Sequence, residues 1–308
     1  MYNSLFQKEW WLEAVAPGQW DVVVVKKGDE LVARLPFVIE KKYGFTILTQ
    51  PPLTPMLGPW LRATNAKHSK QLSTQKELIW ELLKKLPRHD LFSQSLHPSI
   101  TNWLPFYWEG FEQTTRYTYL LNELSNLDVL WDGFNEQVRR NIRKAQSKVT
   151  VKMGLDVERF LDINEKTFLR QQRKLPYSRE LVKRIDSAAR DQNASQIFYA
   201  EDSTGRIHAA IYILWDEQSA YYMMGGEDPE LRNSEASSLL MWRAIQFASN
   251  VTKVFDFEGS MIQPIERFFR GFGTKQVTYS HITRASKKLK VLQHMREIFR
   301  SITERNES

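Results

Sequence analysis

The order of helix-like and strand-like segments occurs twice along the 308 residues. In the second half, the patterns follow the order strand, two helices, three strands, helix, strand, helix, strand. These segments lie at 149–154, 157–168, 178–191, 195–202, 207–215, 219–226, 236–249, 253–259, 264–270 and 275–284. The first half repeats most of this order at 4–15, 20–28, 30–42, 43–51, 74–87, 90–98, 100–111 and 114–124. Two copies of one unit indicate two similar domains.

The repeated unit places the chain in the α/β class, with a mixed sheet of the α+β kind, and predicts two tandem domains. We expect residues 1–125 to form the N-terminal domain and residues 126–308 to form the C-terminal domain. A linking helix is expected at 127–148, because apolar residues recur there at intervals of four. They are Leu130, Phe134, Val138 and Ile142.

Composition narrows the class of protein. The chain has no cysteine, which excludes thiolate nucleophiles, thiolate metal sites and disulfides and is typical of a reducing cytoplasm. Residues 1–15 are acidic and aromatic rather than basic and then apolar, so no signal peptide is predicted. The apolar runs are too short to span a bilayer, and a cytoplasmic protein is expected. The formal net charge of +7 favours anionic partners, although a protein with lysine-rich solvated faces has the same charge.

The strand pattern at 253–259 ends in polar residues where a buried strand would stay apolar. Asp256 and Glu258 are two apart and therefore share one face of a strand. One of them is a candidate general base, with a pKa raised by the aromatic side chains around it. Two structural alternatives stand beside this hypothesis: Asp256 as a buried polar anchor, and Glu258 as a cap of the following helix. Ser260 would either cap that helix or hydrogen-bond to a substrate.

Three motifs carry a resemblance to a known group of proteins. The sequence RRNIRKA at 139–145 resembles an Arg-x-x-Ile/Leu-Arg-Lys/Arg-Ala helix, and FDFEGS at 255–260 resembles a strand that ends Asp-Phe-x-Gly. The sequence IERFFRGFG at 265–273 resembles a Phe-Lys-x-x-Phe-Gly helix end. With the repeated element order, which covers nearly the whole chain, they resemble tandem copies of the GCN5-related N-acetyltransferase (GNAT) fold. The FemABX peptidyltransferases and the CelD-like acyltransferases are the similar families.

This resemblance implies an acyl- or aminoacyl-transferase that acts on an amine or hydroxyl of a cell-envelope or polysaccharide precursor. The donor would be acyl-CoA or aminoacyl-tRNA, used as a co-substrate without a tightly bound cofactor. The resemblance places the donor cleft in the C-terminal domain, between adjacent, parallel and splaying strands at 219–226 and 253–259. The N-terminal domain would be a degenerate copy that shapes the acceptor site. The donor, the acceptor and the oligomeric state stay open.

The basic helix motif offers a surface for anions. Its basic residues project away from the apolar stripe, either as a solvated face or as a grip on phosphates of tRNA, a nucleotide or a lipid-linked precursor. These residues are Arg139, Arg140, Arg143 and Lys144. The lysine of the family's helix end falls on Phe269, so that Arg270 is the nearest cation. Tyr279, on the next strand, is a further candidate substrate contact.

The start of the helix at 236–249 is the candidate donor site. Typical GNAT enzymes carry Gln/Arg-x-x-Gly-x-Gly/Ala there, and its backbone N–H groups bind pyrophosphate. This chain has RNSEAS at 232–237, so that Glu235 would put a negative charge beside the phosphates. The departure argues against conventional acetyl-CoA binding. The candidate phosphate-binding residues are Arg232, Asn233, Ser234 and Ser237, together with the helix N-terminus.

Two other functions remain open. One is a non-catalytic RNA- or nucleotide-binding protein on a GNAT fold. Its signature would be that Glu235 and Phe269 prevent binding of the acyl donor. The other is an acetyl-CoA-dependent N-acetyltransferase. The six histidines form no pair with metal-ligand spacing, so no metal site is predicted. The chain has neither a Gly-x-Ser-x-Gly motif nor a Walker A lysine, which excludes the corresponding serine hydrolases and P-loop NTPases.

Overall fold

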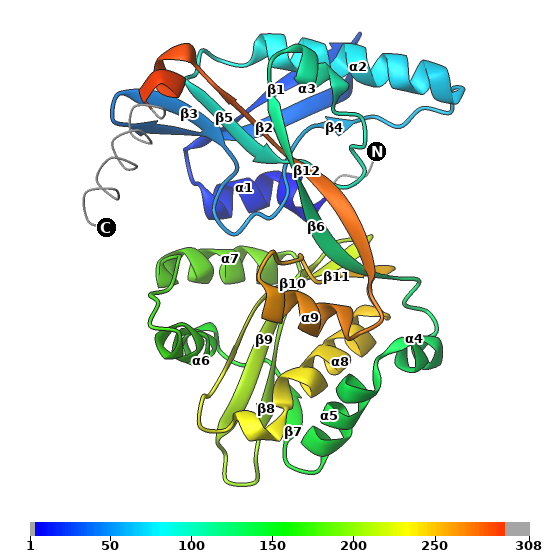
Figure 1. The fold of residues 1–308 in the computed structure, drawn as a ribbon, viewed down its shortest axis with the longest axis vertical. Helices are drawn as coiled ribbons and strands as arrows, with labels where there is room; N and C mark the ends of the chain where they lie inside the picture. Colours follow the sequence, from blue (N-terminus) through cyan, green and yellow to red (C-terminus); the bar gives the residue numbers. More distant parts are fainter. Residues whose placement is uncertain (1–3, 293–308) are drawn as a thin grey trace, which may run out of the picture. The chain divides into compact units, whose positions relative to one another are not determined.

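A computed structural model of the chain describes residues 4–292, and its described part forms two compact units (Figure 1). Unit 1 comprises residues 4–7, 16–116 and 279–292, and unit 2 comprises Lys8–Val15 and Tyr117–Thr278. The units are therefore not two consecutive stretches of chain, as the expected division into 1–125 and 126–308 would have it. Strands β6 (Glu112–Asn122) and β12 (Lys275–Ala285) each begin in one unit and end in the other.

The sheet of unit 1 is mixed. Its strands are β1 (Trp20–Lys27), β2 (Glu30–Lys42), β3 (Phe45–Thr49), β4 (Trp60–Leu61), β5 (Leu91–Ser95) and the end of β12. The sheet order is β1-β2-β3-β5-β12, in which only the β3–β5 pair is parallel and β4 pairs with β2. The helical segments are η1 (Leu5–Gln7), α2 (His68–Lys85) and α3 (Leu104–Trp108). The core of the unit includes Phe37, Leu48, Leu82, Phe92 and Phe106.

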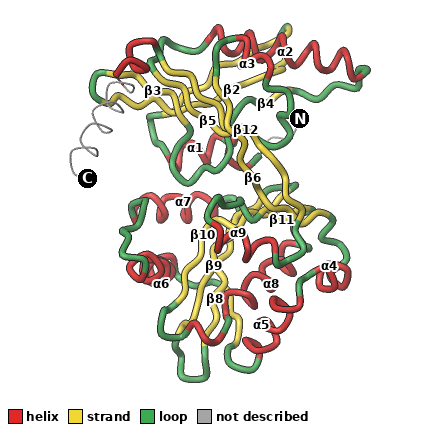
Figure 2. Tube along the Cα trace, viewed as in Figure 1, coloured by secondary structure: helices red, strands yellow, loops and turns green. Residues whose placement is uncertain are grey.

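Unit 2 contains α1 (Glu9–Val15) and the chain from the end of β6 to the start of β12. Its strands are β7 (Thr150–Met153), β8 (Ser195–Glu201), β9 (Ile207–Trp215), β10 (Ser219–Glu227) and β11 (Val254–Asp256). Its helices are α4 (Leu127–Gly133), α5 (Glu136–Gln146), α6 (Val157–Arg170), α7 (Arg179–Asp191), α8 (Ala236–Ala248) and α9 (Gln263–Arg270), with a short turn η2 (Arg232–Ser234). The sheet order is β7-β8-β9-β10-β11-β6. Figure 2 colours the helices red and the strands yellow.

The predicted parallel pair is present. Strands β10 and β11 pair over three positions, from Ser219 opposite Val254 to Tyr221 opposite Asp256. Strand β10 then continues alongside β9 as far as Glu227, whereas β11 ends at Asp256. The crossover through α8 allows this parallel arrangement, and the two strands part beyond Asp256. The expectation that these two strands are adjacent and parallel is therefore confirmed.

The strand on the other side of β11 comes from an earlier part of the chain. Strand β6, which precedes the linking helix, pairs antiparallel with β11, so that Leu121 lies opposite Phe255. Helix α1 likewise belongs to unit 2, where it packs against α7. Pairings between distant segments leave no local trace in a sequence, so periodicity could not reveal them.

The expected linking helix at 127–148 is two helices rather than one. Helix α4 ends at Gly133, and α5 begins after Asn135, whose side chain caps it by accepting the N–H of Val138 at 2.8 Å. An asparagine side chain is more favourable as the cap at the start of a helix than in the interior of one. A new helix therefore begins after Asn135, and α4 does not continue through it. The predicted apolar stripe is confirmed, because Phe134, Val138 and Ile142 are buried in the core of unit 2 and Leu130 packs against it.

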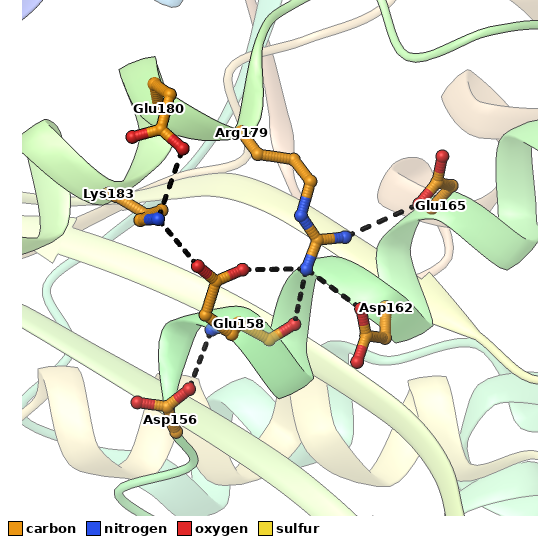
Figure 3. A network of polar contacts seen from close by, with 7 residues as sticks. All are labelled: Asp156, Glu158, Asp162, Glu165, Arg179, Glu180 and Lys183. Carbon is orange, nitrogen blue, oxygen red and sulfur yellow. Dashed lines mark hydrogen bonds and ion pairs between the residues drawn. The ribbon is translucent and has the colours of Figure 1, made fainter.

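Helices α6 and α7 are joined by a network of charged side chains (Figure 3). The guanidinium of Arg179 contacts the carboxylates of Glu158 and Asp162 at 2.8 Å each and that of Glu165 at 3.4 Å. Lys183 pairs with Glu158 at 2.7 Å, on the other carboxylate oxygen. The network therefore connects one face of α6 to the start of α7, and α6 in turn packs against β10.

Candidate active site

Asp256 lies at the end of β11 and is almost completely buried, with 5% of its surface exposed. Its Oδ1 atom accepts two hydrogen bonds, one from the hydroxyl of Thr118 and one from the backbone N–H of Glu258 at 2.8 Å. Burial raises the pKa of Asp256 to about 6, although both hydrogen bonds act to lower the pKa. The buried-anchor hypothesis for Asp256 therefore agrees with the geometry.

Glu258 has an unusual backbone and an unusual carboxyl group. Its φ is +58°, in the left-handed region that non-glycine residues rarely adopt. Its Oε1 atom is buried and has no hydrogen-bond partner among the described residues. Burial first, and the charge of Asp256 second, raise the pKa of Glu258 well above its ordinary value. A strained residue with a buried and unpaired carboxyl oxygen is the kind of feature that marks functional sites.

The capping alternative for Glu258 is wrong. Helix α9 begins at Gln263, its cap residue is Ile262, and no side chain caps it. Ser260 does not cap this helix either, because its hydroxyl accepts the N–H of Ile262 at 3.0 Å and so stabilises the turn before α9. The serine therefore shapes the loop that follows the carboxyl pair.

The backbone conformation and the close neighbours of residue 259 require a glycine there. Its φ is +63°, and a Cβ atom at this position would overlap the carbonyl oxygen of Tyr117 on β6. Two successive left-handed residues, Glu258 and Gly259, thus turn the chain sharply away from β11 while β6 passes close behind it.

Across the diverging strands, β10 contributes a tyrosine that sequence reasoning missed. The β9–β10 register shifts between Tyr222 and Met224, which is a bulge of the kind that re-aims side chains near active sites. A Cβ at Gly225 would overlap the hydroxyl of Tyr222, so this glycine makes room for the tyrosine. Burial raises the pKa of Tyr222, and the carboxylates of Glu227 and Glu258 raise it further.

A second tyrosine, Tyr177, is linked to β10 through the side-chain amide of Asn164. The hydroxyl of Tyr177 donates to Oδ1 of Asn164 at 2.7 Å, and Nδ2 of Asn164 donates to the carbonyl of Gly225 at 2.7 Å. Helix α6 approaches β10 so closely that a Cβ at Gly226 would overlap the backbone of Asn164. The glycine pair inside a strand was the signal in the sequence that could have indicated this close approach.

The candidate donor residues at the start of α8 lie in the same unit. Arg232 forms an ion pair with Glu227 at 2.6 Å, and the hydroxyl of Ser237 donates to the other oxygen of this carboxylate at 3.1 Å. Ser234 is buried and donates to the carbonyl of Leu231 at 2.9 Å. The carbonyl of Asn233 accepts Nζ of Lys148 at 3.2 Å. Two of the expected phosphate ligands are thus engaged with Glu227.

Glu235 holds the conformation expected of a glycine. Its φ is +62°, and it is the cap residue of α8, although its side chain caps nothing. Its carboxylate pairs with Lys144 of α5 at 3.3 Å. The loop therefore keeps a left-handed cap despite the missing glycine, and Lys144 offsets the negative charge that Glu235 brings. Backbone N–H groups in the first turn of a helix lack intrahelical acceptors and remain suited to an anion.

Helix α5 brings its basic residues close to this loop, since it packs against α8. Arg140, Arg143 and Lys144 are exposed and Arg139 is partly buried. Arg139 donates to the carbonyl of Asp132 at 3.1 Å, and the guanidinium of Arg143 lies 5.6 Å from the ring centre of Trp131. The end of α5 is thus joined to the donor loop through Lys144 and Lys148, which the sequence alone did not reveal.

The two remaining candidates have different surroundings. Arg270 is exposed and pairs with Glu266, one turn earlier on α9, at 2.8 Å. Phe269, which stands at the position of the family lysine, is buried and contacts the rings of Tyr119, Tyr222 and Phe257. Tyr279 belongs to unit 1, whereas Asp256 and Glu258 belong to unit 2. Among residues 4–292, no cluster of side chains has the composition of a metal site.

Comparison with known proteins agrees with this fold. Residues 133–261 match the model of the acetyltransferase (GNAT) domain, which includes α5, the donor loop and the carboxyl pair. No curated protein matches the chain at a significant level. Enzymes of this fold use acyl-CoA as a co-substrate.

Solved structures share the fold across both units. The structure of FemX matches with a TM-score of 0.68 at 13% identity, over 90% of this chain and 91% of that one. A tandem GNAT protein from the clavulanic acid biosynthesis pathway matches with a TM-score of 0.54 at 12% identity, over 88% and 84%. L-PGS from Bacillus licheniformis matches with a TM-score of 0.53 at 10% identity, over 91% and 89%. Residues 133–261 of the chain therefore carry a GNAT domain, and the chain has a tandem fold similar to that of FemX.

Proposed function

We propose that unit 2 transfers an acyl or aminoacyl group to an amine or hydroxyl of a cell-envelope or polysaccharide precursor, with Glu258 as the general base. One observation carries this assignment. The Oε1 atom of Glu258 is buried and has no hydrogen-bond partner among the described residues, and the residue sits on a strained backbone just after the β10–β11 pairing ends. A side chain that is held so unfavourably, and has nothing to bind in the protein, is available to a substrate.

The raised pKa suits the role. A general base works best when its pKa lies near the working pH, and an ordinary glutamate is too weak a base at neutral pH. Burial and the neighbouring Asp256 move the pKa of Glu258 in the required direction. The two carboxyls are close enough to disfavour ionisation of both together, so that one of them keeps a proton more readily than it would alone.

The reaction needs little covalent chemistry from the protein. The acceptor nitrogen or oxygen forms a bond to the acyl carbon, the bond from this carbon to its leaving group breaks, and Glu258 takes the proton that the acceptor loses. That proton then neutralises the leaving group. Asp256 fixes the backbone of Glu258 through the 2.8 Å hydrogen bond to its N–H, so that the base is held in position.

The residues at the start of α8 fit a phosphorylated donor in part. The first turn of α8 offers backbone N–H groups, and Lys144 and Lys148 lie beside the loop. Glu227 and Glu235 are negative, but each is already paired with a cation, Arg232 and Lys144 respectively. We infer that the donor phosphates are bound by Arg232 and Lys144, together with Asn233, Ser234 and Ser237. The surface for a larger donor would be extended by Arg139, Arg140 and Arg143. Ser260, Arg270 and Tyr279 remain proposed substrate contacts.

The test is to incubate the purified protein with acyl-CoAs and with charged tRNAs and to measure which donor is consumed. Glu258→Gln keeps the size of the side chain and removes the base, so we expect turnover to fall roughly a hundredfold to ten-thousandfold with a folded protein that still binds donor. Glu230→Gln, at an exposed loop position, is the matched control and should keep full activity. Full activity of Glu258→Gln would show that this residue is not the base. Binding of tRNA or nucleotide without any turnover would favour the non-catalytic alternative.

A further inference from the structure

Unit 1 has a surface of large exposed side chains that the proposed reaction does not use. We call it the α2–α3 face, and it consists of Lys76, Trp80, Lys84, Leu104, Tyr107 and Trp108. Trp80 is 49% exposed, Leu104 46%, Tyr107 58% and Trp108 59%. Tryptophan and tyrosine are usually well buried, so a group of them at the surface of one unit calls for a partner.

The face results from two helices that each have apolar side chains both in the core and at the surface. Helix α2 buries Leu78, Ile79 and Leu82 in the core of unit 1 and leaves Trp80 outside. Helix α3 has the sequence LPFYW and contains no polar residue except the tyrosine hydroxyl. It buries Pro105 and Phe106 and has its other three side chains exposed. Exposure of these apolar groups costs free energy in water, and no packing within the unit requires it.

Contacts between the helices make the face one continuous surface. Helices α2 and α3 pack against each other (Figure 1). The Nζ atom of Lys76 on α2 lies 5.6 Å from the ring centre of Trp108 on α3, and that of Lys84 lies 4.5 Å from the ring centre of Trp80. The indole N–H of Trp80 donates to the carboxylate of Glu109 at the end of α3. Each exposed indole is therefore held in place and accompanied by an ammonium group.

We propose that the α2–α3 face docks onto the surface of a bilayer that contains anionic lipids. Tryptophan and tyrosine favour the boundary between lipid headgroups and acyl chains, because one part of each ring system is apolar and another is polar. Lysines beside them meet the phosphates of anionic lipids, and Leu104 adds an aliphatic contact. Helix α2 carries four lysines against two glutamates, and the charge of the chain is +7, which has the sign that this partner requires.

Single-stranded nucleic acid is the other polyanion that binds aromatic and basic side chains together. It binds by stacking bases on the faces of aromatic rings. Lys76 and Lys84 lie over one face of Trp108 and of Trp80, so those faces are covered by ammonium groups. Both indoles are nevertheless about half exposed, which suits insertion between lipid headgroups better than base stacking. Among the described residues no helix is long and apolar enough to cross a membrane, so the contact would be peripheral.

The experiment is co-sedimentation of the full chain with phosphatidylcholine vesicles that contain or lack phosphatidylglycerol. We expect binding to the anionic vesicles, weakened by added salt, and little binding to the neutral ones. Trp80→Ala with Trp108→Ala should weaken binding at least about tenfold, because most of the buried apolar area is lost. Lys76→Gln with Lys84→Gln should weaken it about fivefold for each lysine.

The chain offers matched controls on the same unit. Tyr43 is 88% exposed and has Lys42 over its ring at 5.7 Å, so Tyr43→Ala removes a similar but isolated aromatic group. Lys26→Gln with Lys27→Gln removes two exposed charges from β1. Both controls should bind anionic vesicles like the original chain, and thermal unfolding should show that all variants are folded.

Three results would overturn the proposal. The first is the absence of binding to anionic vesicles by the original chain, and the second is equal binding by the face variants and the controls. The third is a loss of single-stranded RNA binding, or of self-association measured by light scattering, in the face variants while vesicle binding is unchanged. That result would assign the face to nucleic acid or to a second copy of the chain instead.

Discussion

The Oδ1 atom of Asp256 accepts the backbone N–H of Glu258 at 2.8 Å, which ties the position of the second carboxyl to the first. The same oxygen accepts the hydroxyl of Thr118 on β6. Asp256 therefore holds the turn after β11 in place, while the Oε1 atom of Glu258 stays without a partner in the described part of the chain. The two residues have different surroundings and, in our proposal, different roles: Asp256 positions and Glu258 reacts.

Asp256→Asn should make stability less dependent on pH. The folded-state pKa of Asp256 is about 6, against an ordinary value of 3.8, so its stabilising contribution is fully present below about pH 4 and is lost as pH rises through 6. Asparagine keeps an Oδ1 acceptor for both hydrogen bonds and does not ionise. Relative to the original chain, the variant should gain up to about 3 kcal/mol in free energy of unfolding between pH 4 and pH 8. Urea unfolding at several pH values measures this, and a difference that stays constant with pH would contradict it.

Asp256→Asn should also change the pH dependence of activity. The charge of Asp256 is one of the two causes that raise the pKa of Glu258, so its removal should lower that pKa. If Glu258 is the base, kcat/KM rises with pH as Glu258 loses its proton, and this rise should occur at lower pH in the variant. A profile of kcat/KM against pH for both proteins checks the prediction. Identical profiles for the two proteins would show that the pKa seen in the activity profile is not that of Glu258.

Glu235→Gly should stabilise the protein and improve binding of coenzyme A. The φ of +62° is strained for glutamate and not for glycine, while the ion pair with Lys144 that the change removes is half-exposed and contributes little. We expect the free energy of unfolding to rise by about 0.5–1 kcal/mol. Calorimetric titration with coenzyme A should show tighter binding, because a negative charge leaves the loop. Glu235→Gln removes the charge and keeps the strain, so it should improve binding without the gain in stability.

The triple change Arg139→Ala, Arg140→Ala and Arg143→Ala should weaken binding of tRNA or of nucleotides. Each phosphate that the protein no longer neutralises should lower the dependence of log K on log salt by about 0.7–0.9. The free energy of unfolding should change by less than about 1 kcal/mol, since these side chains lie off the buried stripe. Arg173→Ala with Lys174→Ala, two exposed cations after α6, is the control. Unaltered affinity and salt dependence in the triple variant would leave these arginines as a solvated face.

Arg179→Ala should destabilise the packing of α6 on α7. The side chain contacts three carboxylates and also donates to the backbone carbonyl of Glu158 at 3.1 Å. It is partly exposed, so the loss should be roughly 1–2 kcal/mol rather than the larger cost of breaking a buried ion pair. Lys183→Ala, which leaves Arg179 in place, should cost less. Chemical unfolding of both variants measures the difference, and equal losses would show that Arg179 is not the centre of the network.

Local patterns in the sequence predicted much of unit 2. Ser178 opens the helix pattern at 178–191, and its hydroxyl caps α7 by accepting the N–H of Leu181 at 3.2 Å. The crossover helix between two apolar runs predicted the parallel pair β10–β11. These features depend on residues a few positions apart, so the chain specifies them wherever it folds. The expectation that Asp256 and Glu258 share one face of a strand is wrong, because β11 ends at Asp256 and Glu258 adopts a left-handed conformation.

The tertiary structure decided the features that depend on distant segments. Only the fold places β6 beside β11, with Thr118 against Asp256, and packs α6 against β10 so that Asn164 joins Tyr177 to Gly225. Only the fold holds Glu258 in a left-handed conformation with a buried oxygen. The sequence by itself determined which residues carry charge, which faces are apolar and where the chain turns. Thr118, which hydrogen-bonds to Asp256, lies 138 residues away in the sequence, and such distant surroundings help to set the pKa of the carboxyl and therefore its chemistry.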